Sequence, residues 1–478
     1  MVKPNQEIIV KIMDEPVNLR EFIEAHKGLK KKKAKRAPKI EQLFKITSEL
    51  ELEQLENIDI VGLQEFSLEL EDVPDIRDQS FVLHKLSDIL VISLLAVLAN
   101  CDTFNEIEIF ARAHIEWLSK FLSLEHGVPT DDTYRVVLSR VDMSYVYDVI
   151  IGLLMKRIDA AISEYGEKDA IDPDIYACDG KVSKSSGRKD AFENSGNKPL
   201  NTLNVYSHNW GACLTQEFIE TKSNEIPAMP KAISKIDIKG GIVTCDALNT
   251  QTKTAEAIVS GGGNYVMAVK GSKKTLYGDL KELFDEAARL KIRNEPSGGQ
   301  SYVRTEEKEQ DTIVIREYYL STDVSCLYKS EEWPNLSSMG LVRKTIISYD
   351  INNPKPVKEE YRYYICGGVD TIEDFKRSTR FHWGVENGLH WQLDFTFKDD
   401  ANKTTPENGA EALQLLKKAA LAILKVAKIV CPPHYRSLKS IRFELSQAYE
   451  KTIGKIFSVL NIDSLIEANT RKPNIKDV

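Results

Sequence analysis

Two short apolar runs in the middle of the chain do most to limit what it can fold into. Ile175–Cys178 and Gly241–Cys245 are too short for ordinary helices, and each is followed directly by an aspartate, Asp179 or Asp246. Short apolar runs that end at polar or turn-forming residues are typical of buried β-strands. We therefore predict that both runs are core strands and that each aspartate stands at a strand end.

The segments around these runs complete an α/β pattern. Leu200–Ser207 and Ala212–Thr221 alternate between apolar and polar residues, and the four residues between them have hairpin character. One helix is predicted from near Pro227 to about Ile236 and another from Thr250 to Ser260, and a further strand is predicted from Tyr265 to Val269. The order strand, hairpin, helix, strand, helix, strand predicts an α/β core with a mixed sheet.

The rest of the chain divides by composition and periodicity. Apolar residues at spacings of three and four between Leu83 and Val97 predict a buried helix, and Thr130 or Asp131 is placed to cap a later one. A short strand at Ile8–Ile12 and a helix at Asn18–His26 are expected in the N-terminal region. We predict six parts: an N-terminal extension without a legible role (1–72), a helical domain (73–165), the first part of the core (166–294), a β-rich insertion (295–370), the second part of the core (371–430) and a helical tail (431–478).

Composition narrows the class of protein. The 478 residues include 42% hydrophobic residues, enough for a sizeable core, and seven scattered cysteines without a CxxC pair, as in a cytoplasmic protein with reduced thiols. The first residues lack the apolar stretch of a signal peptide, and the longest apolar run, Ile89–Ala99, is shorter than the roughly 18–20 residues that span a bilayer. We therefore expect a cytoplasmic protein without a membrane partner.

Positive charge is local in this acidic chain. The net charge is −8, but lysines and arginines gather at residues 30–36, 181–189, 270–274 and 417–418. Such clusters can contact phosphates even in an acidic protein, although any one of them can also be a solvated face. The cluster at 181–189 stands out because it directly follows Asp179.

The segment Arg380–Asp394 is unusually rich in ionisable and aromatic side chains. It holds two tryptophans, two histidines and two carboxylates in fifteen residues. If it is one helix, i, i+4 spacing aligns four ionisable side chains on one face: His382, Glu386, His390 and Asp394. Three apolar side chains would then anchor other faces in the core: Trp383, Leu389 and Leu393.

Three carboxylates have both a structural and a functional interpretation. Taken singly, Asp179 could form a tight turn, Asp246 could cap the following helix, and Glu386 could be an exposed helical residue. Taken together, two aspartates at strand ends and a glutamate on a covering helix form a set of oxygen ligands suited to Mg²⁺ or Mn²⁺. Two such ions about 3.5–4 Å apart support phosphodiester chemistry, and the lysines at 181, 184 and 270 would contact substrate phosphates.

The sequence also resembles a known family. Eight stretches carry the resemblance in the family's order across residues 73–430: HKLSDILVISLLAVLA (84–99), GVPTDDTYR (127–135), CDGK (178–181), KSNEIPAMP (222–230), VTCDALNTQ (243–251), YVMAVK (265–270), EWPNL (332–336) and HWGVENGLHWQLDFTF (382–397). They are similar to those of DDE transposases of bacterial insertion sequences, in the branch of H-repeat-associated proteins.

The resemblance implies a fold and a function. It implies an RNase H-like core in which Asp179, Asp246 and Glu386 are the catalytic, metal-binding triad for two Mg²⁺ ions (Mn²⁺ as a substitute). The implied activity is DNA cleavage and strand transfer at insertion-sequence ends. The partners would be double-stranded DNA and a second copy in a homodimer, acting at the bacterial nucleoid.

The family motifs also assign accessory residues. We expect six DNA contacts: Lys181, Lys184, Lys222, Lys270, Arg316 and His382. Three residues of the motif around Glu386 are expected in supporting roles: Asn387, His390 and Asp394.

The chain departs from the family pattern at two places. The family has Asn-Gln after the lysine-glycine that matches Lys270-Gly271, where this chain has Ser272-Lys273, and a His-Gly-Arg signature ahead of the arginine that matches Arg316, where it has Glu309–Asp311. These departures keep open a second hypothesis, a transposase-derived DNA-binding or regulatory protein that no longer transposes.

A third hypothesis concerns a different metal. His382, Glu386 and His390 could together hold zinc or iron, but the two strand-end aspartates would then have no role. Trp210 and Trp333 are expected to pack in the core, with stacking on an unpaired base as the alternative.

Overall fold

A computed structural model describes residues 9–12, 14–30, 36–48, 61–166, 171–187, 198–219, 225–350, 357–405, 409–430 and 436–460. The chain forms two compact units. Unit 1 comprises Met1–Lys35, Pro173–Cys178 and Met229–Trp383, and unit 2 comprises Arg36–Asp172, Asp179–Ala228 and Gly384–Val478. Strand β3 (Ile175–Val182) begins in unit 1 and ends in unit 2.

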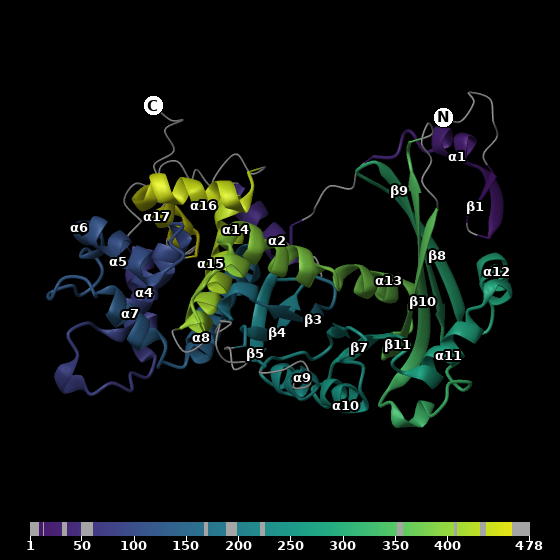
Figure 1. The fold of residues 1–478 in the computed structure, drawn as a ribbon, viewed down its shortest axis with the longest axis horizontal. Coiled ribbons are helices and arrows are strands. Elements are labelled where there is room, and N and C mark those ends of the chain that lie inside the picture. The colour runs from purple at the N-terminus through teal and green to yellow at the C-terminus, as the bar shows by residue number, and fades with distance from the viewer. Residues whose placement is uncertain are drawn as a thin grey trace, which may run out of the picture. The chain divides into compact units, whose positions relative to one another are not determined.

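Unit 1 is built on strands paired in the order β3-β6-β7-β11-β10-β9-β8. Beyond β3 these strands are β6 (Ile242–Cys245), β7 (Asn264–Val269), β11 (Lys358–Gly367), β10 (Leu336–Ser348), β9 (Thr312–Ser321) and β8 (Gln300–Glu309). Strands β3, β6 and β7 are parallel, and the later pairs are antiparallel. Figure 1 shows the long strands β8 to β11 side by side.

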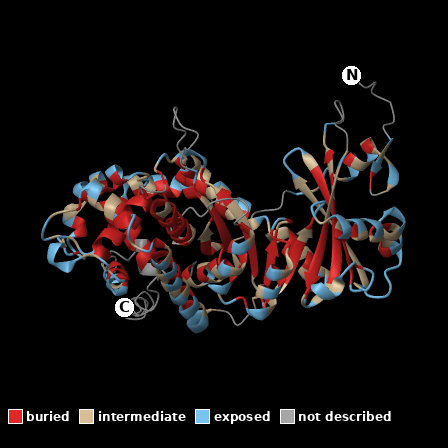
Figure 2. Ribbon diagram, turned by 60° about the horizontal axis from the view of Figure 1, so that its bottom comes forward, coloured by how far each residue is buried: buried red, intermediate tan, exposed pale blue. Residues whose placement is uncertain are grey.

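The core of unit 1 joins the parallel strands to the β-rich insertion. Apolar side chains from both parts share one cluster, which includes Ile175, Ile242, Tyr318 and Phe375. Phe375 lies on α13 (Ile372–Phe381), and the other helices are α9 (Glu225–Ser234), which straddles both units, α10 (Thr252–Ser260), α11 (Lys274–Leu283) and α12 (Glu286–Asn294). Figure 2 shows these strands largely buried.

The described N-terminal residues pack onto the β-rich insertion. Strand β1 (Ile9–Ile12) and helix α1 (Leu19–Ala25), which Asn18 caps, match the predicted short strand and helix. Strand β2 (Glu15–Asn18) was not predicted. Their apolar side chains form a second cluster with β9 and β10: Ile12, Leu19, Ile23, Ile313, Ile315 and Ile347. The predicted extension is therefore divided, because its residues up to Lys35 belong to unit 1 and residues 36–72 belong to unit 2.

Unit 2 is mostly helical. Its helices are α2 (Pro38–Ser48), α3 (Val61–Glu69), α4 (Leu86–Leu98), α5 (Phe104–Ala113), α6 (Ile115–Leu118), α7 (Asp131–Leu138), α8 (Met143–Tyr165), α14 (Trp391–Phe397), α15 (Ala410–Val430), α16 (Leu438–Gln447) and α17 (Tyr449–Leu460). Helix α4 is buried along its whole length and packs against α15, as its apolar sequence predicted. Thr130 caps α7 through its side chain, which confirms one of the two predicted caps.

The strands of unit 2 complete the mixed sheet. The end of β3 pairs with β4 (Asn201–Ser207), which forms an antiparallel hairpin with β5 (Ala212–Phe218). Parallel neighbours on one side of β3 and an antiparallel hairpin on the other make an RNase H-like arrangement, so the predicted fold class is confirmed. No helix in the described part of the chain has both the length and the apolar character needed to cross a membrane.

Candidate active site

The register of the parallel strands sets the position of the two predicted aspartates in the fold. Within unit 1, Cys178 of β3 pairs with Cys245 of β6. Each cysteine is followed in the chain by one of the aspartates, Asp179 or Asp246. Asp246 directly follows β6, as predicted. Asp179 does not end a strand, because β3 continues through it to Val182, so that part of the prediction is wrong. Because the two strands are parallel, each aspartate follows its paired cysteine in the same direction, towards the carboxyl ends of the strands, where ligand sites of open α/β sheets form.

Asp246 is oriented by a local turn in unit 1. Its Oδ1 accepts hydrogen bonds from the backbone N–H groups of Leu248 and Asn249 and from Asn249 Nδ2, each at 3.2 Å. The carboxylate therefore caps the turn at 247–249. It does not cap α10, which begins at Thr252 after Gln251, so that structural interpretation is wrong. All three donors bond the same oxygen. The turn therefore holds the carboxylate through Oδ1, and none of these three bonds involves Oδ2.

Asp179 lies next to a histidine in unit 2. Its side chain is 26% exposed, and its Oδ2 is 3.7 Å from His390 Nδ1. Asn204 Nδ2 donates to the backbone carbonyl of Asp179 at 3.4 Å and contacts His390 Nε2 at 3.3 Å. His390 and Asn204 therefore both lie beside Asp179, and no sequence pattern pointed to Asn204.

The segment that carries Glu386 is not one regular helix, contrary to the prediction. Helix α13 ends at Phe381, His382 and Trp383 form a turn, and the chain re-enters a helix whose residues Glu386–His390 form the π-helix η7. A π-helix has a wider turn than an α-helix, so i, i+4 residues no longer align. The predicted single face is therefore wrong: His382 Nδ1 bonds Thr244 Oγ1 of β6 at 3.0 Å, whereas His390 contacts Asn204 of β4.

Contacts within unit 2 explain why the helix widens here. Tyr206 of β4 packs against both glycines of the segment, and a Cβ added to Gly388 would overlap Tyr206 Oη. Lys425 of α15 donates to the Gly388 carbonyl at 2.9 Å and to Tyr206 Oη at 3.3 Å. The glycines admit the tyrosine ring, and the lysine bonds a carbonyl next to it. A side chain that inserts into the backbone hydrogen-bond ladder is a known cause of helix distortion.

Replacing Gly388 with alanine tests this packing. The new Cβ would overlap Tyr206 Oη, so we expect a loss of about 1–3 kcal/mol in the free energy of unfolding, measured by urea denaturation. Gly152→Ala is the matched control, because a Cβ there meets nothing within 4 Å and alanine is the better helix former, by up to about 1 kcal/mol. Equal stabilities for the two variants would contradict the packing.

The two tryptophans of the segment do not anchor it. Trp383 is 36% exposed beneath the Arg362 guanidinium, and Trp391 is 52% exposed and stacked on Phe395. The anchors are instead apolar residues with at most 1% exposure: Val385, Leu389 and Leu393. The prediction is therefore wrong for Trp383 and confirmed for the two leucines. Trp210 and Trp333 are both buried, which confirms core packing for them.

Both histidines of the segment are neutral at pH 7. Burial lowers the pKa of His382 to about 4, against a smaller opposing effect of Asp246. Burial lowers the pKa of His390 to about 3, and Lys181 and Lys418 act in the same direction. Neutral imidazoles donate or accept hydrogen bonds, but they do not supply the positive charge that phosphate contacts favour. His382 therefore lacks the charge that a phosphate contact at this position would use.

The buried environment of Lys425 gives stability a defined pH dependence. Burial lowers the pKa of Lys425 to about 7, whereas the unfolded chain has a lysine pKa of about 10.4. Between these two pKa values the unfolded state binds more protons than the folded state. The contribution of Lys425 to the free energy of unfolding is therefore lost as the pH falls from 10 towards 7. Between pH 7.5 and 9.5 we expect wild type to gain stability over Lys425→Met, on the order of 1 kcal/mol per pH unit, by urea denaturation. Parallel profiles for the two proteins would contradict this assignment.

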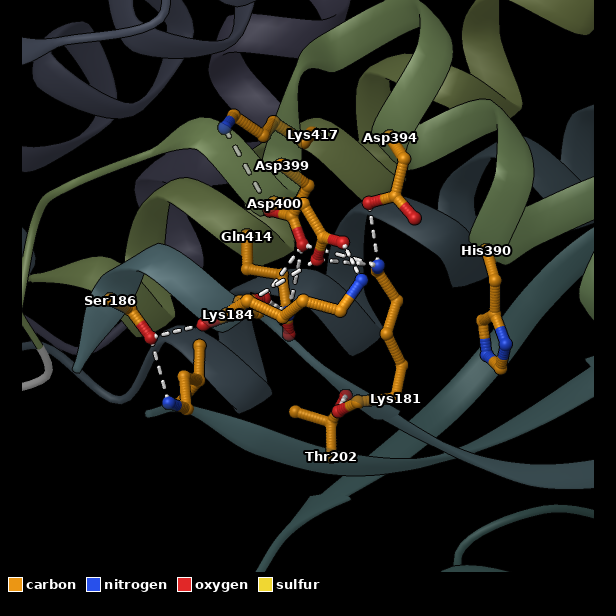
Figure 3. A network of polar contacts seen from close by, with 12 residues as sticks. Lys181, Lys184, Ser186, Thr202, His390, Asp394, Asp399, Asp400, Gln414 and Lys417 are labelled. Carbon is orange, nitrogen blue, oxygen red and sulfur yellow. Dashed lines mark hydrogen bonds and ion pairs between the residues drawn. The ribbon is translucent and has the colours of Figure 1, made fainter. Parts of the chain in front are cut away.

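Lys181 lies in a network of carboxylates in unit 2. Its ammonium is 2.6 Å from Asp394 Oδ1, 3.5 Å from Asp400 Oδ1 and 3.9 Å from Asp399 Oδ2, and its side chain is only 5% exposed. Figure 3 shows Lys181 pointing from β3 towards these three carboxylates. Lys184 is 77% exposed and pairs with Asp400 at 2.6 Å. Lys181 lies two residues after Asp179 in β3. The network therefore connects this part of β3 to α14 and to the 3-10 helix η8 (Asp399–Ala401).

The other predicted DNA contacts lie in different environments. Arg316 is buried and paired with Glu307 and Glu309, so it serves an internal network in unit 1. Lys270 is exposed. Lys222 falls outside the described residues. Lys417 and Lys418, one of the basic clusters, are fully buried on α15 and are not a charged surface.

The two aspartates fit the oxygen-ligand chemistry expected of a magnesium site. Asp246 is held by three N–H donors on a single oxygen, as an orienting shell requires. Among the described residues, no three histidine, cysteine, aspartate or glutamate side chains already converge on a common metal position. The zinc hypothesis gains no support within the described residues, and one ring nitrogen of each histidine is already in a hydrogen bond.

Comparison with known proteins gives a consistent classification. The family model "Transposase DDE domain" matches residues 172–423, which is more than half of the chain, and the model "DDE_Tnp_1-associated" matches residues 68–152. "Putative transposase YncI" of Escherichia coli O157:H7 is 31% identical over 362 residues, which cover 74% of this chain and 86% of that protein. "H repeat-associated putative transposase YhhI" of Escherichia coli K12 is 30% identical over 357 residues, which cover 75% and 89%.

A solved piggyBac transposase synaptic complex with hairpin DNA aligns over 93% of this chain and 86% of its own, with a TM-score of 0.31 and 11% identity. Classification therefore depends on the sequence matches and the strand arrangement described above. The chain belongs to the DDE transposase family.

Proposed function

We propose that this protein cuts DNA at insertion-sequence ends and joins the resulting 3′ ends to target DNA. The observation that supports the proposal is the parallel pairing of Cys178 with Cys245, since Asp179 and Asp246 are the residues that follow these two cysteines in the chain. Glu386 would complete the triad from the segment that follows the β-rich insertion, as in the family's motif. The substrates would be two duplexes, the element's end and its target.

The triad would hold two Mg²⁺ ions, with Mn²⁺ as a substitute. When bound, such ions stabilise charge on the attacking and leaving oxygens of a phosphodiester. The protein's own contribution is orientation: the turn at 247–249 holds Asp246, and His390 lies beside Asp179. Lys270, which is exposed, is the predicted phosphate contact that the structure best supports. Because two ends must be brought together, we propose that the protein acts as a homodimer.

The proposal is tested with the DNA that flanks the gene. Linear duplex carrying the flanking inverted repeats is incubated with purified protein in Mg²⁺, in Mn²⁺ or in EDTA, and strand breaks are mapped to the nucleotide. We expect breaks at the ends of the repeats in either metal and none in EDTA. Binding without breaks in both metals would contradict the proposal.

A second function is favoured by one observation. Arg316, whose counterpart in the family follows the His-Gly-Arg signature, is tied here to Glu307 and Glu309 inside unit 1. An arginine held by two carboxylates has less positive charge to offer a DNA backbone. The alternative is therefore a DNA-binding protein derived from a transposase, which would give the outcome of binding without breaks.

A further inference from the structure

A chain of buried polar side chains runs through unit 2 to Asp179. It begins at Lys418 on α15, continues through Asn204 on β4, and ends at His390 on η7. Lys418 is 2% exposed and Asn204 is fully buried. Buried polar groups without partners are costly, so each hydrogen bond in such a chain constrains the next.

Lys418 determines which way the Asn204 amide faces. The Lys418 ammonium donates to Asn204 Oδ1 and to Gln216 Oε1 of β5. An ammonium has three donors and no acceptor, so the amide atom that faces it must be the oxygen. The Asn204 Nδ2 group is thereby turned towards the Asp179 carbonyl at 3.4 Å and His390 Nε2 at 3.3 Å.

Asn204 in turn determines the tautomer of His390. Nδ2 can only donate, so His390 Nε2 must accept and cannot carry a proton. The ring proton of the neutral imidazole is then on Nδ1, which lies 3.7 Å from Asp179 Oδ2. An approach of less than about 1 Å would bring this pair to an ordinary N–H···O distance of about 2.9 Å.

We infer that Lys418 and Asn204 are positioning residues that hold His390 as its Nδ1–H tautomer, with that proton directed at the Asp179 carboxylate. The role rests on the proposed function, because it matters for catalysis only if Asp179 is a catalytic ligand. A carboxylate that accepts a hydrogen bond from a fixed neighbour keeps one orientation, and outer-shell partners of this kind typically change metal affinity by about 10–100-fold.

The test is a measurement of ring tautomers in the full-length protein. Histidines are labelled with ¹⁵N, the long-range correlation spectrum is recorded at pH 7 without metal, and His390→Gln identifies the His390 signals. We expect wild type to show the Nδ1–H pattern at His390. An Nε2–H pattern in wild type would overturn the inference, whether or not any variant folds.

Asn204→Asp separates positioning from simple packing. A carboxylate at 204 can pair with Lys418 but cannot donate to Nε2, so His390 should switch to the Nε2–H tautomer. In the cleavage assay, the Mg²⁺ concentration for half-maximal activity should rise by about 10–100-fold. Asn105→Asp makes the same chemical change at an exposed site on α5 and should alter neither readout.

The outcomes distinguish the two claims. An Nδ1–H tautomer in a wild-type protein that never cuts DNA would reject the proposed function and leave the positioning intact. An unchanged tautomer in folded Asn204→Asp would reject the positioning, even if cleavage is lost. Lys418→Met gives a further check, because a released amide can rotate, and we expect a mixture of both tautomers.

Discussion

Replacing any member of the triad with its amide, as Asp179→Asn, Asp246→Asn or Glu386→Gln, should lower metal-dependent cleavage by at least about 10³-fold. An amide has nearly the same shape as the acid, but it lacks the negative charge that holds a divalent cation. The Asp246→Asn side chain would keep an oxygen for the N–H groups of Leu248 and Asn249, so the turn should survive. The measurement is the single-turnover rate of strand breakage in Mg²⁺.

The controls for this prediction separate chemistry from folding. DNA binding, measured by gel shift, should change by less than a few-fold in all three variants. Glu256→Gln, the same change at an exposed position on α10, should cut at the wild-type rate. A triad variant that retains wild-type cleavage would remove that residue from the proposed site.

Lys181→Met should have the largest effect on stability. Three carboxylates surround the Lys181 ammonium, and Asp399 is as buried as the lysine itself. Removing one partner of a buried ion pair leaves uncompensated charge, at a cost of about 3–5 kcal/mol. We expect a loss of that size in the free energy of unfolding, measured by urea denaturation at pH 7.

Lys184→Met is the matched control for this cluster. Lys184 pairs with Asp400 but is 77% exposed, so its loss should cost at most about 1 kcal/mol. Similar losses for the two variants would show that the Lys181 cluster does not hold β3 to the following helices. The same comparison tests whether Lys181 is an internal ion-pair partner and not a phosphate contact.

The sequence was most informative where local pattern alone decides structure. The starts of β3 and β6 were predictable because short apolar runs have few alternatives, but the continuation of β3 through Asp179 to Val182 was not, since those residues are mostly polar. Strand β8 was not predicted, because Gln300–Glu309 is polar and none of its residues is fully buried. It pairs only with β9, and an edge strand can be held by backbone hydrogen bonds without an apolar face.

The site was harder to predict because distant residues decide it. The break in the helix around Glu386 depends on Tyr206, about 180 positions earlier in the sequence, which fills the space beside Gly384 and Gly388. The burial of Lys181 depends on carboxylates more than 200 residues later. A single sequence shows the residue types of such contacts, but it does not show which of them meet.

Metal location tests the central claim most directly. Crystals of the protein bound to a DNA end, grown in Mn²⁺, would show the metal by its anomalous scattering. The proposal predicts manganese bound by carboxylate oxygens of Asp179, Asp246 and Glu386, at distances of roughly 2.0–2.2 Å, as for similar hard cations. Manganese bound elsewhere, for example by Asp394, Asp399 and Asp400 in place of Lys181, with none at the triad, would contradict it.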